Sequence, residues 1–233
     1  MKNMVETAQT WDRRSGVDLV TNHLYEEIVS LRLLPGAKIS EAEIAARFGI
    51  SRQPVRDAFT RLANLDLLQI RPQKATEVRR FSIKAIETSR FVRASIEAEV
   101  LRRAAGLCDA KGAQALDEAL EQQQALLTNG DYCDFGEHDY AFHKLLCEIA
   151  GVPNVFDVIQ TEKAKVDRLC MLGLSKEDRM PLLIDDHTAI ATHIKAGEPE
   201  KAVEAGKLHL SRLDYTIESI RERNAAYFDD EEE

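Results

Sequence analysis

The sequence predicts a mainly α-helical protein made of two unlike parts. Apolar residues recur at helical spacing along most of the chain, and one short stretch near residue 70 alternates between apolar and polar residues as β-strands do. The third observation is charge: residues 1–80 hold 13 lysines and arginines against 10 acidic residues, a net of +3, in a chain of net charge −9. The remaining residues therefore carry −12. Only the front part suits a polyanionic partner.

Composition argues against a membrane-spanning protein and a disulfide-rich secreted protein. The longest apolar runs are far shorter than the roughly 20 residues of a membrane helix, and the first residues contain no apolar signal-peptide core. We expect a cytoplasmic protein without a membrane partner. The cysteines are widely spaced, which favours core positions over disulfides or a thiolate zinc site: Cys108, Cys133, Cys147 and Cys170.

The first element expected is a helix over residues 16–33, ended by the turn at Pro35 and Gly36. Its apolar positions recur at helical spacing: Val20, Leu24, Ile28 and Leu31.

A helix-turn-helix is expected next. Ser40 and Glu43 have the spacing of a capping box at the start of a short helix, which Gly49 closes. After a three-residue turn, Ser51 caps a third helix, and Pro54 lies in its first turn, the part of a helix that tolerates proline. Two helices joined by a tight glycine turn form this motif.

The third helix is expected to present basic and amide side chains outward, away from its apolar stripe. Arginine can bind guanine O6 and N7, and glutamine can pair with adenine. A short two-stranded β-ribbon, the wing, follows with a turn at residues 71–74, whose basic residues suit the minor groove or backbone phosphates. The sequence thus predicts binding of double-stranded operator DNA through Ser51, Arg52, Gln53, Arg56, Arg71 and Lys74.

This front part resembles the winged helix-turn-helix of the GntR family of bacterial transcription regulators, over the stretch LPGAKISEAEIAARFGISRQPVRDAFTRLANLDLLQIRP. The resemblance implies a DNA-binding domain over residues 1–80. Relatives commonly have a glycine at the wing tip where this chain has Ala75, so the wing turn is a point of departure from the family pattern.

Residues 81–233 are expected to form an all-α antiparallel bundle of about six helices. The apolar spacing stays helical, without a β-rich run or a repeat of fixed period. Breaks are expected at GLCDAKG, TNGD, AGVPN, GLSKEDRMP and AGEPE.

Asp139 and His143 lie four residues apart, so their side chains share one face of a predicted helix. Three interpretations are open: a hydrogen bond that holds a core histidine, a general acid and base, or two ligands of a metal. His187 and His209 lie beside the apolar stripes of two later helices. Buried imidazoles need partners, and one shared metal would satisfy all three. Three imidazoles and a carboxylate suit a divalent ion, zinc first, with nickel or manganese as alternatives.

The bundle resembles the FCD effector domain of the same family, in its FadR-like subfamily. Metal-binding members have an Asp-x-x-x-His pair on one helix and one histidine on each of two later helices. This chain matches at every position, which implies that the metal ligands are Asp139, His143, His187 and His209. In these relatives the metal helps to hold a small carboxylate effector.

The stretch RFVRASIEAEVLRRAA resembles the first bundle helix of the same domain. The resemblance implies that Arg93 pairs with the effector carboxylate through two hydrogen bonds and that Glu97 orients it. The alternative is an exposed ion pair between residues four apart. Asn154 is a further effector candidate, with a helix N-cap as its alternative.

These predictions favour a homodimeric, ligand-responsive transcription regulator, in the form of a repressor released by a small organic or sugar acid. A metal-dependent hydrolase, with Glu97 or Asp186 as base, is the rival. A structural or metal-storing zinc bundle is a third possibility. An enzyme gives no reason for a winged helix-turn-helix, and no H-E-x-x-H motif is present. A structural bundle leaves the outward arginines unused, so we predict a regulator without enzymatic activity.

Overall fold

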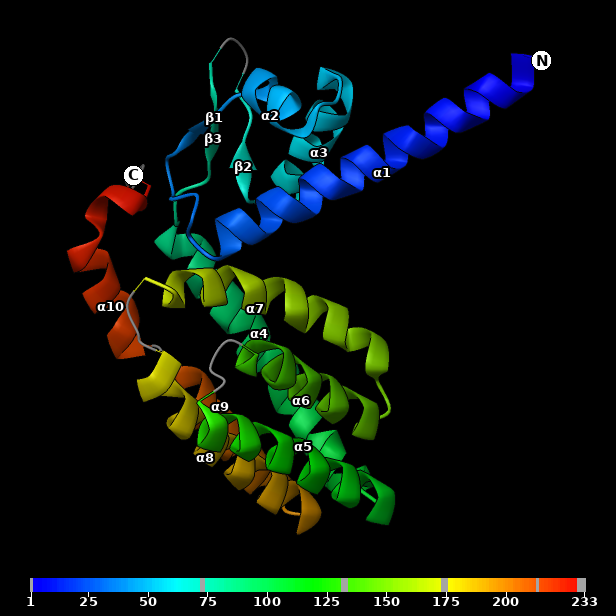
Figure 1. Cartoon of the computed structure of the whole chain (residues 1–233). Helices are drawn as coiled ribbons and strands as arrows, with labels where there is room; N and C mark the ends of the chain where they lie inside the picture. The colour runs from blue at the N-terminus through cyan, green and yellow to red at the C-terminus, as the bar shows by residue number, and fades with distance from the viewer. Residues whose placement is uncertain (1, 72–73, 131–133, 173–175, 213, 230–233) are drawn as a thin grey trace. The chain divides into compact units, whose positions relative to one another are not determined.

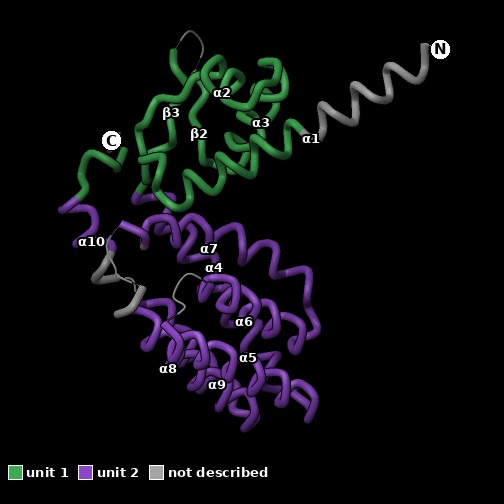
Figure 2. The backbone as a smooth tube through the Cα atoms, viewed as in Figure 1, with its two compact units in different colours: residues 1–82, 224–233 green, residues 83–223 purple. Residues whose placement is uncertain are grey.

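The computed structural model describes residues 2–71, 74–130, 134–172, 176–212 and 214–229, and it is mainly helical, as the sequence predicts (Figure 1). The chain divides into two compact units (Figure 2). Unit 1 comprises residues 1–82 and 224–233, and unit 2 comprises residues 83–223. No helix of the described residues is long and apolar enough to cross a membrane.

Within its described residues, unit 1 contains three α-helices, α1 (Lys2–Val29), α2 (Glu41–Phe48) and α3 (Arg52–Asn64), and a short 3₁₀ helix, η2 (Ala225–Tyr227). α1 ends before residue 33, the predicted end, because Leu31 takes a left-handed φ of 59°, which a helix cannot continue. Gly49, with φ of 65°, closes α2 and begins the three-residue turn before α3. The predicted helix-turn-helix is therefore present. Its core includes Val20, Leu24, Ile28, Val55, Phe59 and Leu62.

The serines that precede α2 and α3 occupy the predicted N-cap positions. Ser40 and Ser51 both have extended backbone there, but neither side chain makes a capping hydrogen bond. The capping box predicted for Ser40 and Glu43 is therefore not formed. These helix starts rest on backbone conformation and core packing.

Three strands form the wing: β1 (Lys38–Ile39), β2 (Leu68–Gln69) and β3 (Thr76–Val78). They pair antiparallel in the order β1-β3-β2, with Lys38 opposite Glu77 and Leu68 opposite Val78. The sequence predicted two strands, and β1 was missed because Lys38–Ile39 pairs with a strand far away in the sequence and has no alternating apolar pattern around it. Residues 72 and 73, at the tip of the predicted wing turn, lie outside the described residues.

The end of the chain belongs to unit 1, whereas the sequence grouped it with the bundle. Phe81 donates its backbone N–H to the carbonyl of Tyr227 at 2.9 Å, and Asp229 donates to the carbonyl of Phe81 at 2.8 Å. The rings of Phe81 and Phe228 pack with centroids 5.5 Å apart. One short parallel bridge makes this contact, so no repeating pattern in the sequence could indicate it.

Unit 2 holds seven α-helices within the described residues, one more than expected: α4 (Ile83–Leu107), α5 (Ala110–Asn129), α6 (Phe135–Ile149), α7 (Phe156–Cys170), α8 (Lys176–Lys195), α9 (Pro199–Ser211) and α10 (Asp214–Arg223). A short 3₁₀ helix, η1 (Pro153–Val155), precedes α7. The break predicted at residues 173–181 is wrong in its second half, because α8 begins at Lys176 and contains Pro181. Pro181 has no backbone N–H to donate within α8, and the ring of a proline inside a helix also crowds the carbonyl four residues earlier.

α4 is the central helix of unit 2 and contacts α6, α7, α8 and α9. Its core residues include Val100, Leu101 and Ala104. Cys147 of α6 is buried in the same core, and Cys108 is half-buried. Cys133 and the side chain of Cys170 lie outside the described residues.

The close contact between α4 and α9 leads to a stability prediction. A Cβ added at Gly206 of α9 would overlap Cδ1 of Leu101, whereas one added at Gly106 of α4 would meet nothing within 4 Å. We expect overpacking in Gly206→Ala to cost about 1–3 kcal/mol of unfolding free energy, against a helix-propensity gain of about 1 kcal/mol. Gly106→Ala should show the gain alone. Thermal unfolding measures both, and equal shifts for the two variants would contradict this packing.

Candidate functional site

Three histidines from three helices meet in the interior of unit 2. His143 of α6, His187 of α8 and His209 of α9 are each at most 7% exposed. One ring nitrogen of each lies within 4.8 Å of those of the other two. The helices bring them together because each histidine lies on the buried face of its helix.

Asp139 joins this cluster from one turn earlier on α6. Its Oδ1 atom lies 3.4 Å from Nε2 of His187 and 3.9 Å from Nε2 of His143. The structure therefore brings all four predicted metal ligands to one place. The 3.9 Å separation is too long for a hydrogen bond, so Asp139 does not hold His143 as an ordinary core histidine.

Two of the three histidines have a hydrogen-bond partner at Nδ1, and Nδ1 of the third lies near a carboxylate without a hydrogen bond. Nδ1 of His143 donates to Oε2 of Glu97 at 3.0 Å. Nδ1 of His187 lies 2.9 Å from Oε1 of Gln123, and Nδ1 of His209 lies 3.6 Å from Oδ2 of Asp186. Histidines that bind metals usually have such carboxylate or carbonyl partners, which fix the ring orientation.

The tautomer of His187 follows from its partner. Nε2 of Gln123 donates to the carbonyl of His138 at 3.2 Å, so its Oε1 faces His187 as an acceptor. The proton of His187 is therefore on Nδ1, and Nε2 carries a lone pair. Nδ1 of His143 likewise carries a proton, because Glu97 accepts from it. The Nε2 atoms of both rings lie near Oδ1 of Asp139, which is an electron-pair donor.

Buried ring nitrogens without hydrogen-bond partners indicate whether this cluster fits a metal ion. Within the described residues, Nε2 of His143, Nε2 of His187 and Nδ1 of His209 have no hydrogen-bond partner. A buried polar atom left unpaired costs roughly 1–3 kcal/mol. A cation would satisfy the two Nε2 atoms and Asp139 together, and three imidazoles with one carboxylate form a donor set that zinc accepts. The residues present therefore fit a divalent metal.

Protonation of the histidines agrees with this donor set. Burial lowers the pKa of His187 well below its ordinary value, and the nearby His209 lowers it further. Burial also lowers the pKa of His209, although its contact with Asp186 opposes the shift. Both rings are neutral at pH 7, which is the form that binds a metal.

The carboxylates at the cluster stay ionised although they are buried. Burial raises the pKa of Asp139, but the charge of Lys163 and its hydrogen bond outweigh burial and hold the pKa well below its usual range. Burial raises the pKa of Glu97 too, but the charge of Arg93 and the hydrogen bond from His143 outweigh burial and hold this pKa below its usual range. Negative charge is therefore available at this site.

Arg93 and Glu97 of α4 form a buried pair, only 4% and 6% exposed, with Nε donating to Oε1 at 2.8 Å. The exposed ion pair considered from the sequence is thereby excluded. Glu97 uses its other oxygen for His143, so it connects the arginine to a predicted metal ligand. The outer nitrogens of Arg93 make no hydrogen bond within the described residues.

The remaining effector candidate does not join the cluster. Asn154 is exposed in η1, and the N-cap of α7 is Val155, so the N-cap interpretation is wrong, while a contact of Asn154 with an effector stays a prediction. Two further buried residues at the cluster were not predicted as site residues: Gln123, 0% exposed, and Lys163, 6% exposed. Helical spacing could have found both, because each lies on the apolar face of its helix.

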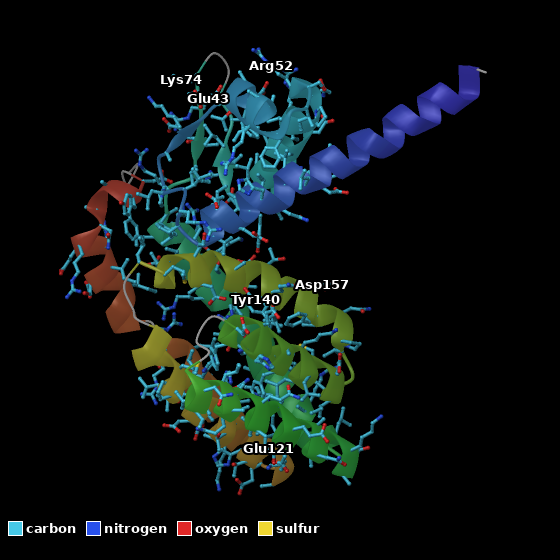
Figure 3. All side chains as sticks on the ribbon, in the orientation of Figure 1. Glu43, Arg52, Lys74, Glu121, Tyr140 and Asp157 are labelled. Carbon is cyan, nitrogen blue, oxygen red and sulfur yellow. The ribbon has the colours of Figure 1, made fainter. Side chains whose placement is uncertain are left out.

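Unit 1 exposes the predicted DNA-binding residues of the turn and α3: Ser51, Arg52, Gln53 and Arg56. Arg56 pairs with Glu41 of α2 at 3.0 Å, and Nε2 of Gln53 donates to Asp57 at 2.8 Å. Arg52 makes no ion pair or hydrogen bond within the described residues and points away from the core of the unit (Figure 3).

The wing exposes two further predicted residues. Arg71 donates from Nη2 to Oε1 of Gln69 at 2.6 Å, and Lys74 is exposed beyond it. In Figure 3, Lys74 and Arg52 lie toward the same end of unit 1. Such an arrangement lets a helix enter a groove while the wing contacts the backbone.

Two family models match these two units. Residues 18–78 match "Bacterial regulatory proteins, gntR family", and residues 90–212 match the FCD domain. The HTH-type transcriptional repressor RspR of Escherichia coli (strain K12) is 33% identical over 208 residues, which cover 89% of this chain and 91% of that protein. The chain belongs to the GntR family. As a GntR regulator with an FCD domain, it is a transcription regulator and not a hydrolase.

Two other comparisons agree with GntR membership. A probable D-xylose utilization operon transcriptional repressor of Paenarthrobacter nicotinovorans is 29% identical over 210 residues, covering 89% of this chain and 91% of that protein. The solved structure of E. coli McbR/YncC superposes with a TM-score of 0.69 at 18% identity, covering 88% of this chain and 97% of that one. That structure supports the shared fold alone.

Proposed function

We propose that this GntR regulator is a homodimeric repressor that leaves its operator when a small carboxylic acid binds beside a metal ion. The main support is that Nε2 of His143 and Nε2 of His187 are buried near Oδ1 of Asp139 and have no hydrogen-bond partner within the described residues. The proposed metal ligands are Asp139, His143, His187 and His209. Zinc is the first candidate, with nickel and manganese as alternatives. A bound metal would supply a Lewis-acidic position for an oxygen ligand.

Arg93 is the proposed second contact for the acid. Glu97 holds its Nε atom, which leaves the two outer nitrogens of the guanidinium for a carboxylate. Because Glu97 also contacts His143, movement of Arg93 toward an acid would be felt at the metal ligands. Organic acids and sugar acids of small size both meet these requirements.

On the DNA side, the proposed groove contacts are Arg52, Gln53 and Arg56, with Ser51 at the helix start. Arg71 and Lys74 are the proposed phosphate or minor-groove contacts. Their exposure on unit 1 supports this assignment. The operator lies on bacterial DNA, so the proposed place of action is the cytoplasm.

A homodimer is expected because one reading helix covers only half of a two-fold operator. Light scattering at the concentration used for DNA binding should give twice the chain mass of 26.2 kDa. A monomer mass, together with full-affinity binding to a two-fold operator, would refute the dimer.

The function as a whole is tested with an operator selected from random DNA by the purified protein. Fluorescence anisotropy then follows release of this operator by zinc-loaded protein as candidate hydroxy acids, dicarboxylates and sugar acids are added. At least one acid should release the DNA. A metal-loaded protein that no acid affects would favour a structural zinc bundle instead.

A further inference from the structure

Lys163 of α7 is a buried cation beside the proposed metal site, and it was not predicted from the sequence. Its side chain is 8% exposed, and its Nζ lies 2.6 Å from Oδ2 of Asp139 and 2.5 Å from Oδ2 of Asp167. The ring of Tyr140 lies 4.4 Å from the same nitrogen. Burying an ammonium group costs several kcal/mol unless it is well paired, so this position needs an explanation.

The two oxygens of Asp139 have different neighbours because of Lys163. Oδ2 is bound by the ammonium group, while Oδ1 faces Nε2 of His187 at 3.4 Å and Nε2 of His143 at 3.9 Å. Free carboxylates can bind a metal through one oxygen or through both. Because Lys163 occupies one lone pair of Oδ2 and holds it away from the ring nitrogens, Oδ1 is the oxygen placed to bind a metal.

Lys163 has no donor left for an effector. An ammonium group has three N–H donors. Asp139 and Asp167 each accept one, and the face of the Tyr140 ring is within cation–π distance of the nitrogen. Its influence on an acid bound at the metal must therefore pass through Asp139.

We propose that Lys163 is a positioning residue: it restricts Asp139 to one-oxygen ligation and thereby keeps a coordination position on the metal for the effector carboxylate. This inference rests on the proposed metal and effector function of the same site. Without Lys163, Asp139 can ligate through both oxygens and occupy the position that the acid needs.

The test uses full-length protein loaded with Co²⁺, whose visible absorption reports the coordination number, and acetate as the probe carboxylate. Lys163→Met removes the cation and keeps an apolar chain of similar length. Lys165→Met is the matched control, because Lys165 lies on the same helix but pairs with Glu162 at 3.0 Å. Lys163→Arg keeps a donor for Asp139 and serves as the conservative variant.

Lys163→Met is expected to bind one Co²⁺ per chain with weaker visible absorption, as a higher coordination number requires. Its apparent acetate affinity should fall by about 10–100-fold, the usual effect of losing an outer partner of a metal ligand. Lys165→Met and Lys163→Arg should keep the wild-type spectrum, and all three proteins should change it when acetate is added.

Two results would overturn the proposal. One is a Lys163→Met protein with the wild-type spectrum and acetate affinity. The other is a folded Lys163→Met protein that binds no cobalt, because Lys163 would then support the whole site rather than one oxygen of Asp139. Wild-type protein that binds no cobalt would refute the metal site itself, which is a separate failure.

Discussion

Replacing Arg52 by alanine is expected to weaken operator binding by about 1–3 kcal/mol and to relax specificity at one base position. Arg52 lies in the first turn of α3 and is exposed. It makes no ion pair or hydrogen bond within the described residues, so DNA binding would break no existing contact of its side chain. Arg56→Ala should also weaken binding, although Arg56 already pairs with Glu41 at 3.0 Å. Titration of labelled operator by fluorescence anisotropy measures both effects.

Controls for this prediction come from the same unit. Arg61 is on α3 but pairs with Asp18 at 2.5 Å on α1, so Arg61→Ala should change operator affinity little. Lys74→Ala should weaken specific and non-specific binding alike and reduce the slope of log affinity against log salt by about 1. Unchanged operator affinity in both Arg52→Ala and Arg56→Ala would remove α3 as the reading helix.

Replacing His187 by alanine is expected to abolish stoichiometric metal binding and, with it, the response to acid. His187 is fully buried, and its Nε2 atom lies 3.4 Å from Asp139 with no hydrogen-bond partner within the described residues. His187→Ala removes one of the four proposed metal bonds and should lower the affinity for zinc. Metal content by elemental analysis and operator release by acid are the two measurements.

His193→Ala is the matched control for this change. His193 lies on the same helix, α8, but is only half-buried and pairs with Glu198 at 2.8 Å, outside the cluster. It should keep both metal and acid response. Operator binding without acid should survive in His187→Ala, as judged in protein whose circular dichroism matches wild type. A variant that keeps stoichiometric metal would place the site elsewhere.

Local rules predicted the helix-turn-helix well because its turn depends on few residues. Gly49 takes the left-handed conformation that closes α2, and Pro54 lies in the first turn of α3, as expected. The strand β1 and the bridge between Phe81 and Phe228 were not predicted. Both consist of backbone pairings between distant segments, which leave no periodic pattern in the sequence.

The site was predicted only in its inner part. Spacing on α6 placed Asp139 and His143 on one face, and positions beside apolar stripes indicated His187 and His209. The family resemblance then implied all four as metal ligands. Helical spacing could have shown that Gln123 and Lys163 lie on buried helix faces. Their partners depend on which helix faces pack together, and single helices do not contain that information.

We propose that metal and acid act together at the histidine cluster to set DNA affinity. The most direct test is the operator affinity of wild-type protein in four states: with and without zinc, each with and without the releasing acid. Because coupling between ligands is reciprocal, bound operator should weaken binding of the acid by the same factor. We expect the acid to weaken operator binding only when zinc is present. Equal release of zinc-free and zinc-loaded protein by the acid would contradict it.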